Sequence, residues 1–366
     1  MKKILLFIIS LIFVFSSCIK IIPKAEDTNF SDLTQDQKEL LIRLIATGYN
    51  KGGNYKFDEL KNLASTTDYD DRILNNYKYF IGITDVMPTK TIELKTIPND
   101  DERIKEYIKS IINKFKDNGE YNNNSDDNFF IDAFNEYIPV NPLRKDRDFS
   151  YLNPKIKNNF MNEDELINRV YNLIYRDYNN NYIFKKWYDK YFGEDFLSSI
   201  KIYAKFLVDM AYTYTHSNAE LNRINYTNSE LYPEKISLNH IPVELLLSIM
   251  YQESKFFPAS FKAEIKTDDE NIEYIDSVSF GLTHTLIDSD YLYISKNYND
   301  IGNNKFEPYN FSMISWYYLY GANPFNNPTG EETYFSDWDL ITIRGSILYS
   351  TIYLDMLYQK LIKYIK

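Results

Sequence analysis

Apolar side chains recur at helical spacing along most of this chain, and this periodicity most restricts the folds that it can adopt. One stripe follows i, i+3, i+4, i+7, i+8 and i+11 in Ile104, Tyr107, Ile108, Ile111, Ile112 and Phe115. Further stripes begin at Leu40 and Leu166, and the stretch from Phe196 to Tyr214 is apolar enough for a buried helix. The pattern predicts a mainly α-helical protein.

A short β pattern interrupts the helical one. Pro242 suits the first position of a helix whose apolar face follows it, and Pro258 disfavours continuation beyond Phe257. Residues 263–266 and 272–275 then alternate on either side of an acidic, turn-like stretch. Alternation around a turn is typical of a β-hairpin, so we expect a helix followed by a small hairpin, and a long last helix from about 340 to 365.

The polar, loop-rich stretch 217–240 predicts a domain boundary. We expect a helical domain of unknown role over residues 34–235 and a second domain, which contains the hairpin, over residues 236–366. The chain has one cysteine, which rules out an intrachain disulfide. Its stability must come from packing, for which an aromatic content of 17% is sufficient.

The N-terminus has the layout of a secretory signal. Lys2 and Lys3 precede an apolar run, and small residues lead to Cys18. We expect residues 1–17 to be removed, because the run is shorter than the roughly 20 residues of a spanning helix. A plain cleaved signal with a chance cysteine and a retained N-terminal anchor are the alternatives.

The segment before Cys18 resembles the lipobox of bacterial lipoproteins, with Phe15 where leucine is usual. The resemblance implies an acylated Cys18 and a polar, lipid-anchored tether over residues 18–33. The protein is then expected in the cell envelope, held to a membrane by its lipid and facing the periplasm or the exterior.

The mature chain is acidic. The whole chain has 41 basic and 52 acidic residues, and loss of Lys2 and Lys3 with the signal changes its net charge from −11 to −13. Nucleic-acid binding depends on basic surfaces, so nucleic acid is not an expected partner. Electrostatic docking on anionic lipid is disfavoured for the same reason.

A polar motif closes the helix that Pro242 begins. It reads Tyr251-Gln252-Glu253-Ser254-Lys255-Phe256-Phe257-Pro258, and Ser279-Phe280-Gly281-Leu282-Thr283-His284 follows downstream. Here the sequence resembles the soluble lytic transglycosylases and goose-type lysozymes. Their catalytic glutamate lies in Glu-Ser-x-Phe-x-Pro at the end of an apolar helix, and a Gly-Leu-Met-Gln segment lines their sugar cleft.

The resemblance covers about residues 236–366 and implies a lysozyme-like α (α+β) domain. It implies that Glu253 is catalytic and that Ser254, Ser279, Phe280, Gly281, His284 and Tyr317 contact the substrate. The activity implied is that of a peptidoglycan lytic transglycosylase, a cell-wall lyase that cleaves MurNAc–GlcNAc bonds and leaves 1,6-anhydro-muramic ends. The family needs no metal and no cofactor, and its partner is the glycan strand.

The chemistry agrees with a single glutamate. Glycosidic cleavage needs a proton donor for the leaving oxygen, and an apolar setting raises the pKa of a carboxyl so that it keeps its proton. Met250, Phe256 and Phe257 are expected to provide that setting for Glu253. Ordinary glycosidases use two carboxylates, and Asp276 is the candidate second acid if water is the nucleophile.

The motif also departs from the family. Thr283 and His284 replace Met and Gln, and the closing Ala-Tyr-Asn-Ala-Gly motif has no counterpart near the end of this sequence. Tyr317 or Tyr318 is one substitute for its tyrosine. The string Thr47-Gly48-Tyr49-Asn50-Lys51-Gly52 is another, if a permuted arrangement returns it to the cleft. These departures support an alternative, a non-catalytic envelope lipoprotein whose degenerate domain binds glycan or protein.

Other polar and aromatic residues have weaker signals. His216 and Glu220 have the i, i+4 spacing of two ligands on a helix, but no third ligand accompanies them, so no metal site is expected. Trp187, Trp316 and Trp338 are candidates for stacking on sugars. We expect core packing for Trp187 and a place in the cleft wall for Trp316.

Overall fold

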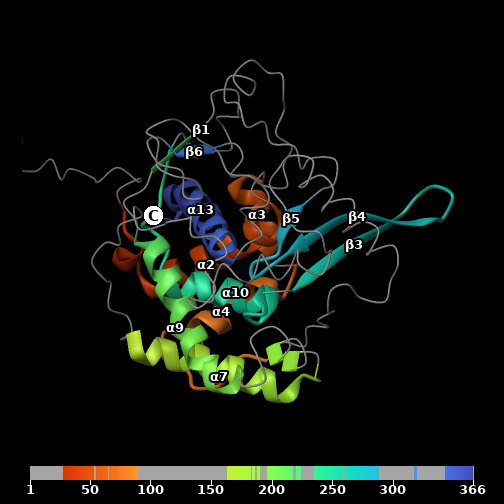
Figure 1. The fold of residues 1–366 in the computed structure, drawn as a ribbon. Helices are drawn as coiled ribbons and strands as arrows, with labels where there is room; N and C mark the ends of the chain where they lie inside the picture. Colours follow the sequence, from red (N-terminus) through yellow and green to blue (C-terminus); the bar gives the residue numbers. More distant parts are fainter. Residues whose placement is uncertain are drawn as a thin grey trace, which may run out of the picture.

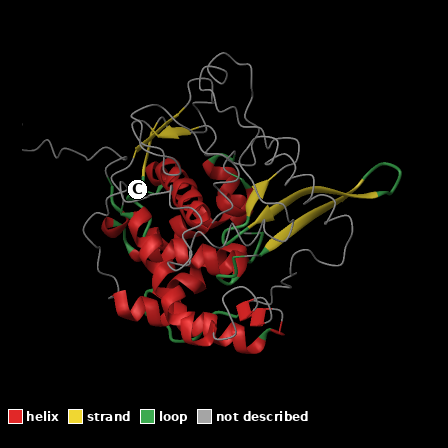
Figure 2. Ribbon diagram, viewed as in Figure 1, coloured by secondary structure: helices red, strands yellow, loops and turns green. Residues whose placement is uncertain are grey.

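Helices make up most of the protein that the structure describes. The structure is a computed structural model, shown along the chain in Figure 1 and by secondary structure in Figure 2. It describes residues 28–52, 55–64, 66–89, 163–182, 184–185, 188–189, 196–216, 220–223, 235–258, 260–287, 317–319 and 343–365. Within these ranges the expected mainly α-helical fold is confirmed.

The helices follow the apolar stripes of the sequence. They are α2 (Gln35–Lys51), α3 (Phe57–Ala64), α4 (Tyr69–Phe80), α7 (Glu163–Asn180), α9 (Phe196–Thr215), α10 (Val243–Ser254) and α13 (Ile343–Leu361), with the 3-10 turns η2 (Phe30–Asp32) and η4 (Ile362–Tyr364). The expected last helix corresponds to α13. Pro242 is the N-cap of α10 rather than its first residue. The stripe from Ile104 to Phe115 lies outside the described residues.

Local signals set both ends of α2. The Thr34 side chain accepts a hydrogen bond from the Gln37 backbone at 3.4 Å, and the Gln37 side chain accepts one from the Thr34 backbone at 2.9 Å. This reciprocal pair is a capping box, which satisfies two amides at the start of a helix. Gly52 ends α2 with φ 103°, a conformation that glycine adopts without steric cost.

One hydrophobic core joins helices from both sides of residue 235. α10 packs against α4, α9 and α13, while α2 packs against α4 and α13. Figure 1 shows α10 in the middle of this arrangement. The buried apolar side chains form a single cluster from Phe30 to Ile365. The core therefore crosses the position where the sequence predicts a boundary between residues 34–235 and 236–366.

The expected β-hairpin is present and longer than the sequence pattern. Strands β3 (Phe261–Thr267) and β4 (Glu273–Phe280) pair antiparallel, with a register shift between Glu264 and Ile265. β5 (Thr285–Ile287) pairs with the base of β4. The acidic tip turns tightly because the Asp268 carboxylate accepts backbone hydrogen bonds from Glu270 and Ile272. Figure 1 shows the two strands projecting from the helical body as an arm.

A second antiparallel sheet has the order β2-β1-β6. It combines β1 (Glu220–Arg223), β2 (Lys235–Ser237) and β6 (Tyr317–Leu319). β1 and β2 lie inside the stretch that the sequence predicts to be loop-rich. Three- and four-residue strands are too short to leave an alternating pattern that can be recognised.

The described residues near the N-terminus are packed against the protein. Phe30 and Leu33 are buried in the core, and the Tyr358 hydroxyl donates a hydrogen bond to the Thr28 carbonyl at 2.6 Å. The described end of the expected tether is thus part of the folded body. Residues 1–27, with the expected signal and Cys18, lie outside the described residues.

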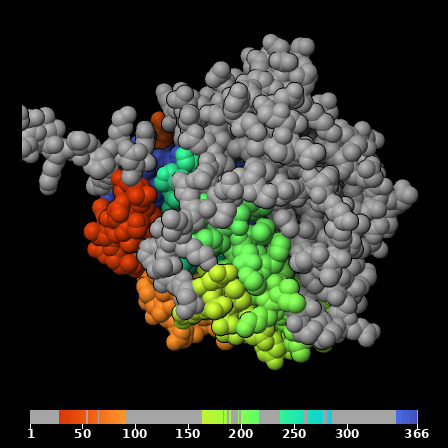
Figure 3. Space-filling model, turned by 60° about the vertical axis from the view of Figure 1, so that its left-hand side comes forward, coloured from red at the N-terminus to blue at the C-terminus, as the bar shows by residue number. Residues whose placement is uncertain are grey.

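Some described helices form the molecular surface. Figure 3 shows α7 and α9, in yellow-green and green, on one face of the molecule. Ile202 and Leu197 of α9 are exposed. Among the described residues, none of the helices combines the length and the apolar character that crossing a membrane requires.

Candidate active site

α10 is buried along its whole length except at Glu253. The other eleven of its twelve residues are buried, whereas the Glu253 side chain is 15% accessible. The helix ends directly after Ser254, at Lys255, which has the left-handed conformation with φ 55°. A buried helix of this kind carries one carboxyl to the surface at its C-terminal end.

Within the part of the chain that the structure describes, Tyr69 and His284 contact the Glu253 carboxyl. The Tyr69 hydroxyl, from α4, donates a hydrogen bond to Oε1. His284 Nδ1 lies 3.2 Å from Oε2. Burial and the neighbouring Glu253 charge raise the pKa of Tyr69 well above its usual value. Tyr69 therefore stays protonated and remains a hydrogen-bond donor to the carboxyl.

His284 is fixed from its other side by Ser260. The His284 Nε2 atom lies 2.7 Å from Ser260 Oγ. The Gly281 amide donates to the Ser260 carbonyl at 2.9 Å, which joins the two ends of the hairpin. Gly281 has φ 81°, a conformation that glycine adopts without steric cost. The hairpin thus closes on itself beside Glu253 and presents His284 to it.

Ser254 holds the turn that carries His284. Its hydroxyl donates to the Leu282 carbonyl at 2.7 Å and is fully buried. Thr283 is equally buried, and its Oγ1 lies 2.7 Å from Ser346 Oγ of α13. The expected contact between Ser254 and substrate is therefore replaced by a structural role, because a hydroxyl enclosed by the protein does not reach a ligand.

Tyr49 of α2 reaches the same turn from the other end of the chain. Its hydroxyl donates to the Thr283 carbonyl at 2.8 Å and lies 3.0 Å from Ser350 Oγ. Burial, and after it the charge of Glu253, raises the pKa of Tyr49. Thr283 directly precedes His284, which contacts the Glu253 carboxyl, so Tyr49 reaches the turn beside Glu253. The string Thr47–Gly52, which resembles the missing closing motif of the family, thus lies at the candidate site.

Backbone strain gathers around Glu253. The described non-glycine residues with positive φ are Lys255, Phe256, Asn271 and His284. Asn271 lies in the hairpin tip. Lys255 and Phe256 come two and three positions after Glu253 in the sequence, and His284 contacts its carboxyl. A left-handed backbone at an ordinary side chain costs on the order of 1–3 kcal/mol. Strain of this kind clusters at functional sites, where the surrounding structure maintains it.

The remaining predicted contacts are dispersed. Ser279 Oγ donates to the Lys262 carbonyl within the hairpin. Phe280 ends β4, but its side chain is not among those described. Tyr317 pairs through its backbone with Arg223 in the β2-β1-β6 sheet, and its side chain is likewise not described. Asp276 forms an ion pair with Lys266 on the hairpin at 2.8 Å.

The weaker sequence signals do not form a site. His216 follows the end of α9 and Glu220 begins β1, so the i, i+4 helical spacing does not apply to them. Within the described ranges, no three His, Cys, Asp or Glu side chains are placed to bind a metal ion. The three tryptophans lie outside the described residues.

The chain Ser260–His284–Glu253 has the nucleophile, base and acid order of a serine hydrolase. The burial of its members argues for another use. Ser260 is only 1% exposed, while the side chains of His284 and Glu253 are 10% and 15% exposed. A nucleophile must reach its substrate, and here the acid end is the accessible one. Of these three side chains, Glu253 is therefore the one that a ligand reaches most readily.

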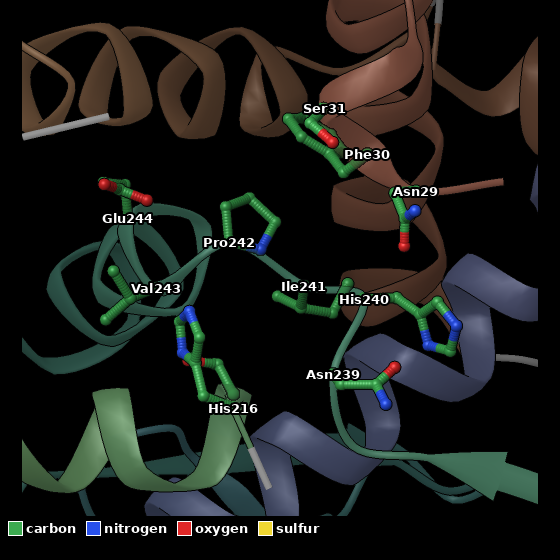
Figure 4. Close-up of a pocket in the computed structure, with 11 residues that line it drawn as sticks. Asn29, Phe30, Ser31, His216, Asn239, His240, Ile241, Pro242, Val243 and Glu244 are labelled. Atoms are coloured by element: carbon green, nitrogen blue, oxygen red, sulfur yellow. The ribbon is translucent and has the colours of Figure 1, made fainter. Parts of the chain in front are cut away.

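A separate small pocket lies at the opposite end of α10. Figure 4 shows its lining residues, which include His216, His240 and Glu244. Its cavity of about 30 Å³ has room for water but not for a sugar. Glu244 is 2% exposed, and burial raises its pKa to about 7. This pocket is distinct from the site around Glu253.

Comparison with known proteins does not extend the assignment. Neither a protein-family model, nor a curated protein, nor a solved structure matches the chain. The case for a function therefore depends on the sequence motif and on the geometry around Glu253.

Proposed function

We propose that the protein is a peptidoglycan lytic transglycosylase that cleaves MurNAc–GlcNAc bonds and leaves 1,6-anhydro-muramic ends. One observation carries the proposal. Glu253 is the single residue of α10 that is not buried, and Tyr69 and His284 hold its carboxyl in place. Fixed orientation is what a catalytic acid needs, because rate falls steeply with misplacement of the reacting groups.

The mechanism requires one carboxyl. Protonated Glu253 donates its proton to the leaving glycosidic oxygen as the C1–O bond breaks. The resulting carboxylate then takes the proton of the C6 hydroxyl as that oxygen bonds to C1 and closes the anhydro ring. The proton balance is zero over the cycle. Asp276, the acid considered for water-mediated cleavage, pairs with Lys266 on the hairpin, which favours the one-carboxyl route.

The lysozyme-like domain is part of this proposal, with Tyr49 as the tyrosine that replaces the closing motif. Its hydroxyl contacts the Thr283 carbonyl, although α2 precedes α10 by almost 200 residues. A permuted order of elements accounts for this placement. Secretion and a lipid on Cys18 would hold the enzyme in the cell envelope, next to its glycan substrate.

Digestion of purified peptidoglycan tests the function. The mature protein should release muropeptides with anhydro ends, detected by mass spectrometry. Glu253→Gln should lose about 10²–10⁴-fold in rate, since general acid-base catalysis contributes that much. Glu244→Gln is the matched control, because it makes the same change in the same helix, and it should retain activity.

Other outcomes of the digestion contradict the proposal. An active Glu253→Gln protein would remove the mechanism. Hydrated reducing ends would indicate lysozyme chemistry with water as the nucleophile. Cosedimentation of wild type and Glu253→Gln with peptidoglycan, without cleavage by either, would favour the alternative of a glycan-binding lipoprotein.

A further inference from the structure

We propose that two copies of this protein associate through the β3 strands of their hairpin arms, which pair antiparallel about a two-fold axis at Ile265. The partner of this strand edge is thus a second copy of the chain. The inference goes beyond the proposed function and does not depend on it, because it rests on the arm alone.

The outer edge of β3 is open for pairing. Within the part of the chain that the structure describes, β3 is the end strand of its sheet, and Figure 1 shows the arm extending away from the helices. The side chains from Glu264 to Tyr274 are exposed. The extra residue at the register shift, Asp276, lies on β4, so β3 itself stays regular. An edge strand presents amides and carbonyls to which a further strand can hydrogen-bond.

The charges on this edge alternate in sign. Side chains two positions apart share one face of a strand, and one face of β3 carries Lys262, Glu264 and Lys266. Asp268 continues the alternation directly after the strand. The Lys262 and Glu264 side chains form an ion pair at 2.7 Å, which agrees with a shared face. Lysine on an edge ordinarily opposes pairing, whereas an alternating pattern can complement itself.

One register pairs each of these charges with its opposite. In it, Ile265 lies opposite its own copy on the axis. Lys262 then faces Asp268 of the other copy, and Glu264 faces Lys266. The two-fold axis repeats both pairs, so all the charges of the alternating row are matched. Opposite charges directly across a ladder stabilise strand pairing, and like charges destabilise it.

Neighbouring registers lack this match. A shift of two residues in one direction puts Glu264 opposite Glu264 and Lys262 opposite Lys266. The same shift in the other direction puts Lys266 opposite Lys266 and Glu264 opposite Asp268. A shift of one residue in either direction leaves Glu264 and Lys266 opposite uncharged residues. The charge pattern therefore selects the register centred on Ile265 through repulsion in the alternatives.

The other face of β3 supplies apolar contacts. Ile265 is 44% exposed and lies opposite Ile275 of β4 within its own arm. In the paired arms the two copies of Ile265 meet on the axis, and Ala263 faces Thr267 of the other copy. Pairing thus removes from water an apolar side chain that the single arm exposes, which favours association.

The interface is small. β3 has seven residues and a length of about 24 Å, so the paired strands bury less surface than the roughly 1,600 Å² of a standard interface. The two helical bodies lie at opposite ends of the paired arms. We therefore expect a weak dimer that forms at high protein concentration.

Charge-reversal variants test the register. Glu264→Lys puts lysine opposite Lys266 of the other copy, and Lys266→Glu puts glutamate opposite Glu264. Each variant alone should associate at least about 10-fold more weakly than wild type, because two pairs change from opposite to like charge. An equimolar mixture of the two variants should recover the wild-type association, since each pair is again of opposite charge. Analytical ultracentrifugation of the mature protein measures this, with a reducing agent to keep Cys18 from linking copies.

Glu270→Lys is the matched control. It makes the same charge change in the exposed tip of the arm, outside the paired residues, and should associate as wild type does. A wild type that stays monomeric at a concentration on the order of 1 mM, where small interfaces also associate, would overturn the inference and leave the edge to a different partner. A mixture that associates no better than its separate variants would overturn it as well.

Cross-linking locates the axis. A residue on a two-fold axis faces its own copy, so Ile265→Cys in a Cys18→Ser background should form a disulfide between two copies under mild oxidation. Opposite Cα atoms in an antiparallel ladder are about 4.5–5.5 Å apart, within the span of a disulfide. Thr267→Cys is the control, because its copy lies four residues along the ladder, about 14 Å away. Equal cross-linking at both positions would contradict an axis at Ile265.

Discussion

Glu244 and Glu253 show how packing separates two identical side chains on one helix. They lie nine positions apart, about 13 Å along the axis of α10. The Glu253 carboxyl is held by Tyr69 and His284 near the surface. The Glu244 carboxyl is almost fully enclosed, and burial raises its pKa to about 7. The environment of Glu253 is suited to chemistry. Ionisation of Glu244 in its buried environment destabilises the folded protein.

Glu244→Gln should stabilise the protein, and the gain should grow with pH, because the wild-type carboxyl destabilises the fold when it ionises. A carboxyl whose pKa is 4.5 in the unfolded chain and about 7 in the folded protein binds its proton more tightly when folded. The stability that the protonated Glu244 carboxyl contributes is therefore fully present below pH 4.5 and is lost as the pH rises toward 7. The gain from Glu244→Gln, measured by urea unfolding, should be larger at pH 8 than at pH 5 by about 2 kcal/mol.

The control for this prediction is Glu270→Gln, because Glu270 is exposed in the hairpin tip. Its effect on the free energy of unfolding should be the same at both pH values within error. A Glu244→Gln gain that does not change between pH 5 and pH 8 would mean that Glu244 is as well solvated in the folded protein as in the unfolded chain.

The contact between α2 and α13 depends on a glycine. A Cβ atom at Gly48 would lie 2.9 Å from Leu357 Cδ2, and the Tyr353 hydroxyl donates to the Gly48 carbonyl at 3.2 Å. The small residue lets the two helices approach closely. Because Tyr49 is the next residue, this approach also sets how far its hydroxyl extends toward Thr283.

Gly48→Ala should destabilise the protein by about 1 kcal/mol in urea unfolding, because overpacking costs about 1–3 kcal/mol and the better helix propensity of alanine returns about 1 kcal/mol. In a Leu357→Ala background the space is open, so the same change should stabilise. A double-mutant cycle measures the coupling. Equal effects of Gly48→Ala in both backgrounds would contradict a steric origin.

Elements with local signals were predictable. The end of α2 at Gly52, the start of α10 after Pro242 and the β3–β4 hairpin each follow from residues a few positions apart. Glu253, Gly281 and His284 were predictable as neighbours because the hairpin folds between them. Tyr69 was not, since it is one of 34 tyrosines and meets Glu253 only where α4 packs on α10.

At the scale of the whole molecule, the candidate site is assembled by the shared core. α10 and α13 supply one side, while α2 and α4, from the first third of the chain, bring Tyr49 and Tyr69. Sequence periodicity does not encode which helices pack together. The apolar stripes therefore predicted where helices form but not which helices they pack against. The site therefore depends on contacts between segments that the sequence pattern alone would assign to separate domains.

Fragments 34–235 and 236–366 should not fold when each is produced alone. Each would expose the apolar faces that α2, α4, α10 and α13 bury against one another, and exposed apolar surface costs about 25 cal/mol per Å². Circular dichroism should show no cooperative thermal transition for either fragment, whereas residues 28–366 should melt cooperatively. Cooperative melting of 236–366 alone would contradict a shared core and restore the two-domain division.

The two ends of the β3–β4 hairpin lie close together in space although many residues separate them along the chain. Ser260 directly precedes β3 and Gly281 directly follows β4, and a backbone hydrogen bond of 2.9 Å joins them. Strands of an antiparallel ladder can lengthen in pairs without moving their common base. The arm can therefore grow, shrink or carry a grafted peptide at its tip while the carboxyl and imidazole keep their mutual position. A search that fixes the number of residues between them would overlook proteins with the same arrangement and a different arm.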